Sequence, residues 1–573
     1  MHYSISYTNP LTHIIDIVFE IEHIDEEEVQ LQLPAWRPGR YELANYAQNV
    51  LSINAYNRSG DAIALTKVSK DRWKAETKGL DYIRVLYSYF AFKMDAGNSW
   101  LDENQLYINF INCMLYVPDR MEEGCTLEIR VPEQYDIVCG LEKTGRSTFQ
   151  AQNFYQLVDC PLIASDSLNQ LQYQIGDVDF NIWIQGLWDL DDKRVIEDFK
   201  RFSESQIDMF GEFPERVYHF LLQILPYRHY HGVEHANSTV ITLGPGSALN
   251  DQDKYDDLLG VSSHELFHTW NVAKIRPEEL FPYKFDQEVY FRTGYAIEGF
   301  TTYYGDLFLI RSGVRDLNWY FDELNRLFKR HFLNFGRHNL SVTDSSFDLW
   351  LDGYKPGIPN RKTSIYVKGA VIALILDLSL RRDSNGESSL DDVMIALWNE
   401  FGKKSIGYSE NDIIEIVERI AQKPYRNFFE DFVYDNAPLE SELDSLLNLV
   451  GCELVIEDAD SMTERLWGFS MAIQGDSYKV IKIEPGSIAE ELLSIDDQII
   501  EINNVKVDDD HNYRVLENRS NQIVIRRFEQ NRTVSITNDN RRYFMQHKIK
   551  RSENASDAQK LAFKAWLGVD FDG

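Results

Sequence analysis

The chain has few cysteines and no long apolar run. Its five cysteines, among 573 residues, are an odd number without a CxxC pair. This argues against a disulfide framework and a thiolate zinc site, so we expect five reduced, buried thiols. The longest apolar stretch, residues 367–380, contains Lys368 and Asp377 and is shorter than the ~20 residues that span a bilayer. The amino end lacks a basic segment followed by an apolar one, so we expect no signal peptide and a cytoplasmic location.

Positive charge is also scarce. Lys and Arg number 58 against 91 Asp and Glu, which leaves a formal net charge of −33. Such a field repels phosphates and anionic lipid, so we expect neither nucleic acid nor a membrane as partner. Hydrophobic residues make up 44% of the chain, which is enough for packed cores, and the length exceeds that of one domain. These features predict a multidomain globular protein.

The spacing of apolar residues changes along the chain. Short alternating runs broken by Pro and Gly come first and are typical of β-strands. The period then lengthens to that of helices, although residues 217–224 and 239–243 still alternate like strands. The predicted fold class is multidomain α+β. Its predicted parts are 1–165, an N-terminal β domain; 166–450, an α+β catalytic domain with a helical bundle; 451–540, a β module; and 541–573, a C-terminal tail.

The strongest motif is His264-Glu265-Leu266-Phe267-His268, in a segment with helical periodicity. Two histidines four residues apart project from one helix face about 6 Å apart, so both imidazoles can reach one Zn²⁺ ion. Glu265 then lies beside the ion and can accept a proton from the attacking water. The alternative is a chance match on a solvated helix, because this pattern occurs in unrelated proteins.

A third zinc ligand is expected further along the chain. Glu298 lies in Gly294-Tyr295-Ala296-Ile297-Glu298-Gly299-Phe300, among apolar and aromatic residues. A carboxylate buried there needs a cation or hydrogen bonds to compensate its charge. The acids at 278, 279, 286 and 288 lie in a polar, Pro-containing stretch and are more simply solvated. We predict Glu298 as the ligand; a structural ion pair is the alternative.

These residues carry a family resemblance. The runs 263–271, 274–277 and 298–306 resemble the M61 glycyl aminopeptidases, which are gluzincins related to the M1 aminopeptidases. Residues 33–41 and 232–235 extend the resemblance over most of the chain. It implies a thermolysin-like catalytic domain behind an N-terminal β domain. One departure is the 29 residues between His268 and Glu298, more than in the M1 relatives, so Glu298 is assigned from its sequence context.

The resemblance also implies roles for three further residues. Glu234 matches the acid that binds the substrate amine, and Gly232 would let the backbone approach closely. Tyr366, in Ser364-Ile365-Tyr366-Val367-Lys368-Gly369, matches a tyrosine that stabilises the oxyanion. A solvated Glu234 and a merely packed Tyr366 are the alternatives. The spacing of His229, His231 and His235 fits neither a helix face nor a single turn, so we expect no second metal site there.

The C-terminal β module resembles a PDZ domain. The resemblance rests on residues 466–470, 485–490 and 497–503. Asp496 and Asn504 stand where PDZ domains usually have glycine, so we expect turns of different shape. A PDZ groove binds a peptide as an added strand and grips its carboxylate, so a peptide C-terminus is a candidate second ligand.

Three functional hypotheses follow. The first is a zinc-dependent aminopeptidase that acts on peptides with a free amino end, with a preference for small first residues such as Gly or Ala implied by the resemblance. The second is a zinc endopeptidase in which Glu234 does not face the amine. The third is a non-catalytic scaffold in which only the PDZ-like module binds peptide. The intact motif residues His264, Glu265, His268 and Glu298 favour an enzyme.

Overall fold

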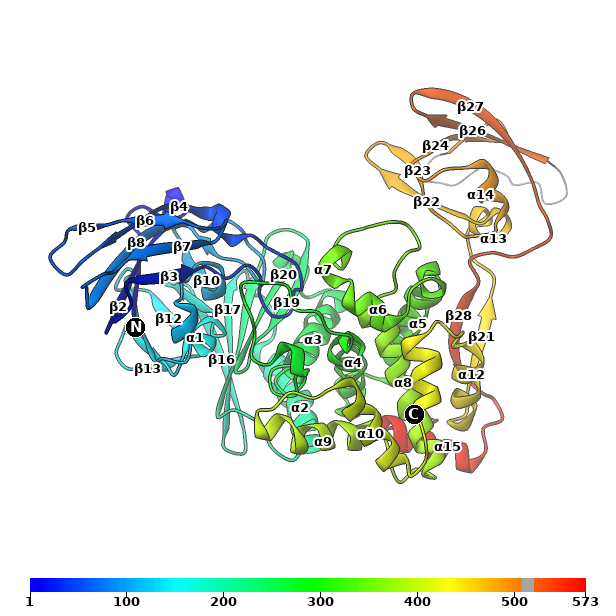
Figure 1. The fold of residues 1–573 in the computed structure, drawn as a ribbon. Helices are drawn as coiled ribbons and strands as arrows, with labels where there is room; N and C mark the ends of the chain where they lie inside the picture. The colour runs from blue at the N-terminus through cyan, green and yellow to red at the C-terminus, as the bar shows by residue number, and fades with distance from the viewer. Residues whose placement is uncertain (508–519, 573) are drawn as a thin grey trace. The chain divides into compact units, whose positions relative to one another are not determined.

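The computed structural model describes residues 1–507 and 520–572, and Figure 1 shows their fold. Contacts between elements divide the chain into two compact units. The first consists of Met1–Asp316, Ser346–Tyr354 and Ser388–Pro424, and the second of Leu317–Ser345, Lys355–Glu387 and Tyr425–Gly573. The helical region that the sequence predicts after residue 316 is therefore shared between the two units.

The first unit begins with a β domain, as predicted (Figure 1). Its main sheet has the strand order β13-β14-β11-β1-β2-β8-β4-β5, and two smaller sheets have the orders β12-β15-β10-β9 and β3-β7-β6. In β2 (Ile14–Glu22) every second side chain is buried, and Phe19 stacks on Tyr3 of β1 (His2–Ser6) with ring centroids 4.4 Å apart. The remaining strands are β3 Glu28–Gln32, β4 Val50–Tyr56, β5 Ala62–Ile63, β6 Leu65–Lys67, β7 Arg72–Glu76, β8 Tyr82–Phe90, β9 Trp100–Leu101, β10 Gln105–Ile108, β11 Cys125–Ile129, β12 Asp136–Cys139, β13 Glu142–Lys143, β14 Thr148–Ala151 and β15 Leu162–Ser165.

A mixed sheet follows in the order β16-β17-β18-β20-β19. Its strands are β16 Asn169–Ile175, β17 Val178–Gly186, β18 Val217–Ile224, β19 His229–Glu234 and β20 Ser238–Gly244. The strands predicted at 217–224 and 239–243 are confirmed as β18 and β20. The segment before β20, for which the sequence analysis predicts no strand, forms β19, antiparallel to β20 at the end of the strand order. A short, polar edge strand lacks the apolar alternation by which strands are recognised.

Helices α2 (Asp192–Phe210), α3 (Gln252–Phe267), α4 (Phe300–Arg311), α9 (Leu390–Glu400) and α10 (Glu410–Ala421) complete the first unit. Capping residues mark the ends of several of these helices. The Asp191 side chain accepts a hydrogen bond from the Lys193 amide at the start of α2, which ends at Gly211 in the left-handed region (φ 80°). Ser409 and Asp412 form a reciprocal capping box at the start of α10.

The second unit is built on α5 (Leu317–Phe332), α8 (Ile365–Asp383) and α12 (Glu440–Leu449). The apolar run 367–380 lies within α8 and is buried throughout, so it is a core helix. No helix among the described residues is both long and apolar enough to cross a membrane. The predicted C-terminal tail contains both a strand and a helix: β28 (Gln546–Arg551) pairs with β21 (Cys452–Glu457), and α15 (Asp557–Leu567) follows.

The PDZ-like module has the strand order β22-β23-β24-β26-β27, formed by β22 Phe469–Gln474, β23 Ser477–Ile483, β24 Gln498–Ile502, β26 Ser520–Arg527 and β27 Gln530–Thr537. Asp496 and Asn504 have φ of 70° and 64°, so both keep the left-handed backbone that glycine favours. The Gly468 amide hydrogen-bonds to the carbonyls of Thr463 and Glu464 and ends α13 (Met462–Trp467). The Gly468 amide therefore already donates hydrogen bonds within the protein. Binding of a peptide carboxylate by the PDZ-like module stays a prediction.

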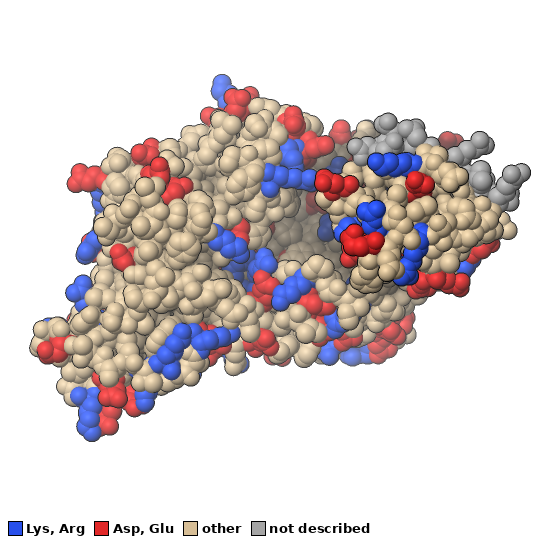
Figure 2. All heavy atoms as spheres, turned by 90° about the horizontal axis from the view of Figure 1, so that it is seen from above, with Lys and Arg blue, Asp and Glu red and all other residues tan. Residues whose placement is uncertain are grey.

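The multidomain α+β architecture is thus confirmed. All five cysteines, which lie within the described residues, are free and buried, as the sequence predicts. Lys and Arg are interspersed with Asp and Glu on the face seen in Figure 2. The excess of acidic residues does not form a single patch on that face.

Candidate metal centre

The two histidines of the motif lie at the end of α3. His264 is in its last turn, and His268 is the C-cap with helical backbone angles (φ −60°, ψ −18°). Their Nε2 atoms are 3.1 Å apart. One ion at the usual Zn–N distance of ~2.0–2.1 Å can therefore contact both. A proton on His268 Nδ1 can donate to the Asn271 carbonyl at 2.7 Å, which leaves the Nε2 lone pair for a metal.

Glu298 reaches the same point from a π-helical turn, Tyr295–Gly299, that leads into α4. Its side chain is buried, and Oε2 lies 3.5 Å from His268 Nε2 and 3.8 Å from His264 Nε2. The three ligand atoms lie within 4.8 Å of one another. Single π-turns recur at functional sites because they redirect one side chain within a helix. The structure thus brings together the three ligands that the sequence predicts.

Asn271 links the histidine helix to the π-turn and was not singled out from the sequence. Its Nδ2 donates to the carbonyls of Ala296 (2.8 Å) and Ile297 (3.1 Å), while its own carbonyl faces His268. One residue therefore fixes both the His268 ring and the turn that carries Glu298. Its position three residues after His268 was the available sequence signal, but its role depends on a contact with a distant segment.

Two more carboxylates face the histidines. Glu234, Glu265 and His268 offer ligand atoms within 4.8 Å of one another. Burial raises the pKa of Glu265 to about 8 and also raises the pKa of Glu234. Burial opposes a charge on His268, but its hydrogen bond to Glu298 and the nearby carboxylates outweigh that effect and raise its pKa to about 10. Burial therefore disfavours the ionised forms of Glu265 and Glu234, while the neighbouring carboxylates favour a proton on His268.

The donor set fits a divalent zinc ion. Two imidazole nitrogens and one carboxylate oxygen are the usual protein ligands of a catalytic zinc, and a fourth position is left for water or substrate. Oxygens of Glu265 and Glu234 that are buried lack hydrogen-bond partners among the described residues. A dication bound there would favour the ionised forms of these acids, and the unpartnered oxygens are placed to accept protons from a water molecule or a substrate.

Glycines bring other segments close to these acids. A Cβ on Gly232 of β19 would lie 2.2 Å from Glu265 Oε1. A Cβ on Gly39 (φ 75°), in the loop Trp36–Tyr41 of the β domain, would lie 2.4 Å from Glu234 Oε2. Because Gly232 has no side chain, another group can approach its backbone closely. In the structure that group is the Glu265 side chain. The N-terminal β domain contacts the predicted amine anchor through Gly39.

The other predicted residues lie as follows. Tyr366 is half-buried in the first turn of α8, behind the N-cap Ser364, and belongs to the second unit. Its role as an oxyanion donor stays a prediction. His229, His231 and His235 join no group of metal-binding geometry among the described residues.

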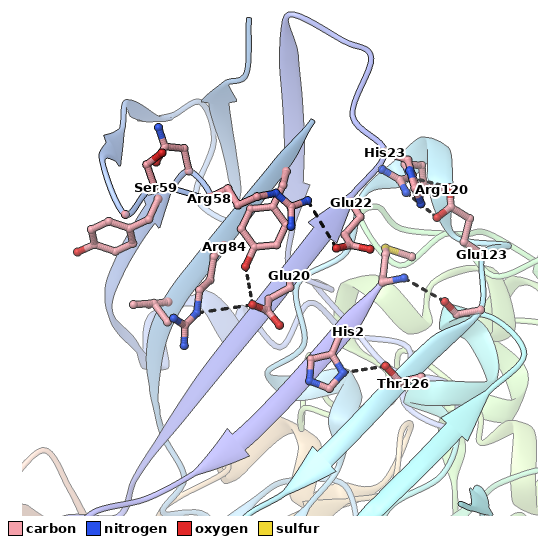
Figure 3. Close-up of a pocket in the computed structure, with 17 residues that line it drawn as sticks. His2, Glu20, Glu22, His23, Arg58, Ser59, Arg84, Arg120, Glu123 and Thr126 are labelled. Atoms are coloured by element: carbon pink, nitrogen blue, oxygen red, sulfur yellow. Dashed lines mark hydrogen bonds and ion pairs between the residues drawn. The ribbon is translucent and has the colours of Figure 1, made fainter. Parts of the chain in front are cut away.

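Another hollow contains none of the candidate metal ligands. A depression of about 930 Å³ on the N-terminal sheet is lined by His2, Glu20, Arg58, Arg84 and neighbouring residues (Figure 3). Most of its charges pair with one another, as Arg58 does with Glu22 at 3.7 Å and Arg120 with Glu123 at 2.6 Å. We assign the chemistry to the buried cluster, which contains the three candidate metal ligands.

The chain matches models of known domain families over three ranges. Residues 2–166 match the Peptidase M61 N-terminal domain, 257–372 the M61 glycyl aminopeptidase domain, and 455–520 the PDZ domain. No curated protein sequence matches the chain.

One solved structure has the same architecture over nearly the whole chain. An aminopeptidase N family protein from Idiomarina loihiensis is similar with a TM-score of 0.89 and 25% identity, covering 99% of each chain. An M1 zinc metallopeptidase from Deinococcus radiodurans has a TM-score of 0.47 at 15% identity and covers 76% of this chain and 93% of its own.

Proposed function

This chain is a zinc metallopeptidase of the M61 aminopeptidase family, and from that premise we propose that it removes the first residue of peptides whose amino end is free. One observation carries the proposal. The Glu234 carboxylate lies at the end of β19, beside Glu265 and His268, and its buried Oε1 has no hydrogen-bond partner among the described residues. A buried carboxylate at that distance from the metal ligands is suited to hold a substrate ammonium.

The remaining groups then have defined tasks. His264, His268 and Glu298 hold the zinc ion, which when bound polarises the scissile carbonyl and acidifies a water molecule. Glu265 accepts the proton of the attacking water and passes it to the leaving amine. The edge strand β19 aligns the peptide by backbone hydrogen bonds and ends at Glu234, so the amino end is held next to the anchor.

We extend the proposal to small first residues such as Gly and Ala, which the M61 resemblance favours. Their side chains require no subsite of their own once the amine is bound. The Gly39 loop, packed against the Glu234 carboxylate, limits the space on that side of the anchor. The PDZ-like module enters this proposal only as a candidate second peptide site.

The proposal is tested with matched peptides that differ only in acetylation of the amine. Acetylation removes a charge-assisted hydrogen bond and leaves Glu234 buried without a partner, a cost of several kcal/mol by analogy with broken buried ion pairs. We expect blocked peptides to be very poor substrates of the wild type. Glu234→Ala should raise KM for free peptides and narrow the difference between free and blocked ones.

The same experiment separates the other hypotheses. Equal cleavage of blocked and free peptides by the wild type identifies an endopeptidase. A protein that contains zinc yet cleaves neither peptide supports the scaffold hypothesis.

A further inference from the structure

The edge strand β19 is a template on which a peptide can lie beside the candidate metal centre. It pairs with β20 on one side and ends the strand order of its sheet on the other. The pairing runs from His229 opposite Gly244 to Glu234 opposite Thr239 without a shift of register. The outer edge of β19 therefore has the regular geometry that an added strand requires.

Alternate residues of β19 direct their backbone groups to this outer edge. The His235 amide donates to the Ser238 carbonyl at 3.0 Å, so these two residues form a hydrogen-bonded pair just beyond the end of β19. Hydrogen-bonded and non-hydrogen-bonded pairs alternate along an antiparallel ladder. It is therefore Tyr230, Gly232 and Glu234 whose amides and carbonyls are directed away from β20.

The same three residues share one face of the strand, because side chains two residues apart point the same way. A Cβ on Gly232 would lie 2.2 Å from Glu265 Oε1, so this face is turned toward α3. Glu234 has its carboxylate beside Glu265 and His268. Tyr230, which is 56% exposed, presents a large side chain on this face, two residues before Gly232.

The proposed function sets the position of a peptide on this edge. Glu234 holds the amine at the end of β19, so the peptide runs antiparallel to the strand, from Glu234 toward Tyr230. The attacked carbonyl of the first residue must lie near Glu265, which itself lies against Gly232. With the first residue opposite Gly232, the third residue lies opposite Tyr230, about 7 Å further along at ~3.4 Å per residue. Side chains directly opposite each other lie on the same face and in contact.

We propose that Tyr230 contacts the side chain of the substrate's third residue and favours a large apolar or aromatic residue there. This inference rests on the proposed function, because it takes Glu234 as the amine anchor. Aromatic pairs across antiparallel strands stabilise each other, and a tyrosine ring offers a broad apolar face. The side chain of the second residue points to the opposite face, so Tyr230 does not select it. Tyr230 is thus a specificity-determining residue that leaves the preference at the first residue unchanged.

The test compares the amidated tripeptides Ala-Ala-Phe, Ala-Ala-Ala and Ala-Phe-Ala, with the released alanine measured by mass spectrometry. We expect wild-type kcat/KM to be about 3–10-fold higher for Ala-Ala-Phe than for Ala-Ala-Ala, with the difference mainly in KM. Tyr230→Ser should bring this ratio close to one and leave Ala-Phe-Ala unaffected, and Tyr230→Phe should retain the ratio. The matched control is Tyr227→Ser, because Tyr227 is similarly exposed (52%) but precedes β19.

The outcomes distinguish this inference from the proposed function. A wild-type ratio near one, or an unchanged ratio in Tyr230→Ser, overturns the role of Tyr230 while aminopeptidase activity stands. An equal loss on all three peptides in Tyr230→Ser gives this residue a structural role only, and a loss confined to Ala-Phe-Ala contradicts the register. Equal cleavage of acetylated and free Ala-Ala-Phe refutes the amine anchor, and with it the peptide position on which this inference depends.

A binding measurement decides if no tripeptide is cleaved. Calorimetry of the zinc-loaded protein with the same peptides should show tighter binding of Ala-Ala-Phe than of Ala-Ala-Ala, and Tyr230→Ser should abolish the difference. Equal binding of the two peptides by the wild type refutes the contact.

Discussion

At the residue scale, the centre gathers three buried carboxylates around two imidazoles. Glu298 is the third candidate ligand. Its Oε2 lies 3.5 Å from His268 Nε2 and 3.8 Å from His264 Nε2. Glu265 and Glu234 lie near the proposed metal position, and each has a buried oxygen that lacks a hydrogen-bond partner among the described residues. The proposed function therefore assigns metal binding, proton transfer and amine recognition to different side chains.

Glu265→Gln should separate metal binding from catalysis. An amide has nearly the same shape but cannot accept the proton of the attacking water, so kcat should fall by roughly 10²–10⁴ with zinc content unchanged. Zinc analysis alongside kinetics checks this. Turnover like that of the wild type would remove Glu265 from the mechanism.

Tyr366→Phe tests the one predicted catalytic residue that lies in the second unit. If its hydroxyl stabilises the oxyanion, kcat should fall by about 10² or more, with metal content and KM nearly constant. A change in thermal stability without a change in kcat would assign Tyr366 to packing.

Much of this site could be predicted from the sequence. The spacing of His264 and His268 is a local helical property, and an acid among aromatic residues indicated Glu298. Asn271 and Gly39 were missed as site residues because their roles depend on contacts with segments far away in the sequence. Nothing in a local pattern shows that Gly39 lies against the carboxylate of Glu234.

At the element scale, the ligand geometry depends on how α3 packs against α4. A Cβ on Gly305 of α4 would lie 3.2 Å from the Cα of His264, and Ser263 Oγ donates to the Gly305 carbonyl at 2.7 Å. The helices therefore touch by their backbones directly behind one ligand. The sequence predicts both helices, but the π-turn before α4 has no periodicity of its own from which to predict it.

Gly305→Val should disturb the metal site although Gly305 is not itself a candidate ligand. The added side chain forces α3 and α4 apart, at a cost of ~1–3 kcal/mol for overpacking, and should weaken zinc binding. Competition with a chelator measures the change in zinc affinity. Gly260→Ala in α3 is the matched control, because its Cβ would meet no atom within 4 Å. Equal zinc affinity in both variants would contradict the account.

At the scale of the whole molecule, all three candidate ligands belong to the first unit. The sequence predicts the order of the β domain, the α+β region and the PDZ-like module. It does not predict that the helical region is divided, with α9 and α10 in the first unit and α5, α8 and α12 in the second. That division depends on contacts between distant helices, which local periodicity does not encode. The pairing of β21 with β28 escaped prediction for the same reason.

Zinc removal should lower the thermal stability of the protein. An ion that binds only the folded state stabilises it by RT ln(1 + [L]/Kd), about 4 kcal/mol at a thousand times Kd. Chelation should therefore lower the Tm of the wild type by several degrees in differential scanning calorimetry. The His264→Ala variant already lacks one zinc ligand, so chelation should change its Tm very little. An equal shift in both proteins would place the stabilising metal elsewhere.

The central claim is that His264, His268 and Glu298 hold the catalytic zinc. The most direct measurement is zinc per chain, with turnover, in the wild type, Glu298→Ala and the control Glu288→Ala, which alters a nearby acid outside the cluster. The account predicts stoichiometric zinc and full activity in the wild type and the control, and strong loss of both in Glu298→Ala. Full zinc content and normal turnover in Glu298→Ala would contradict it.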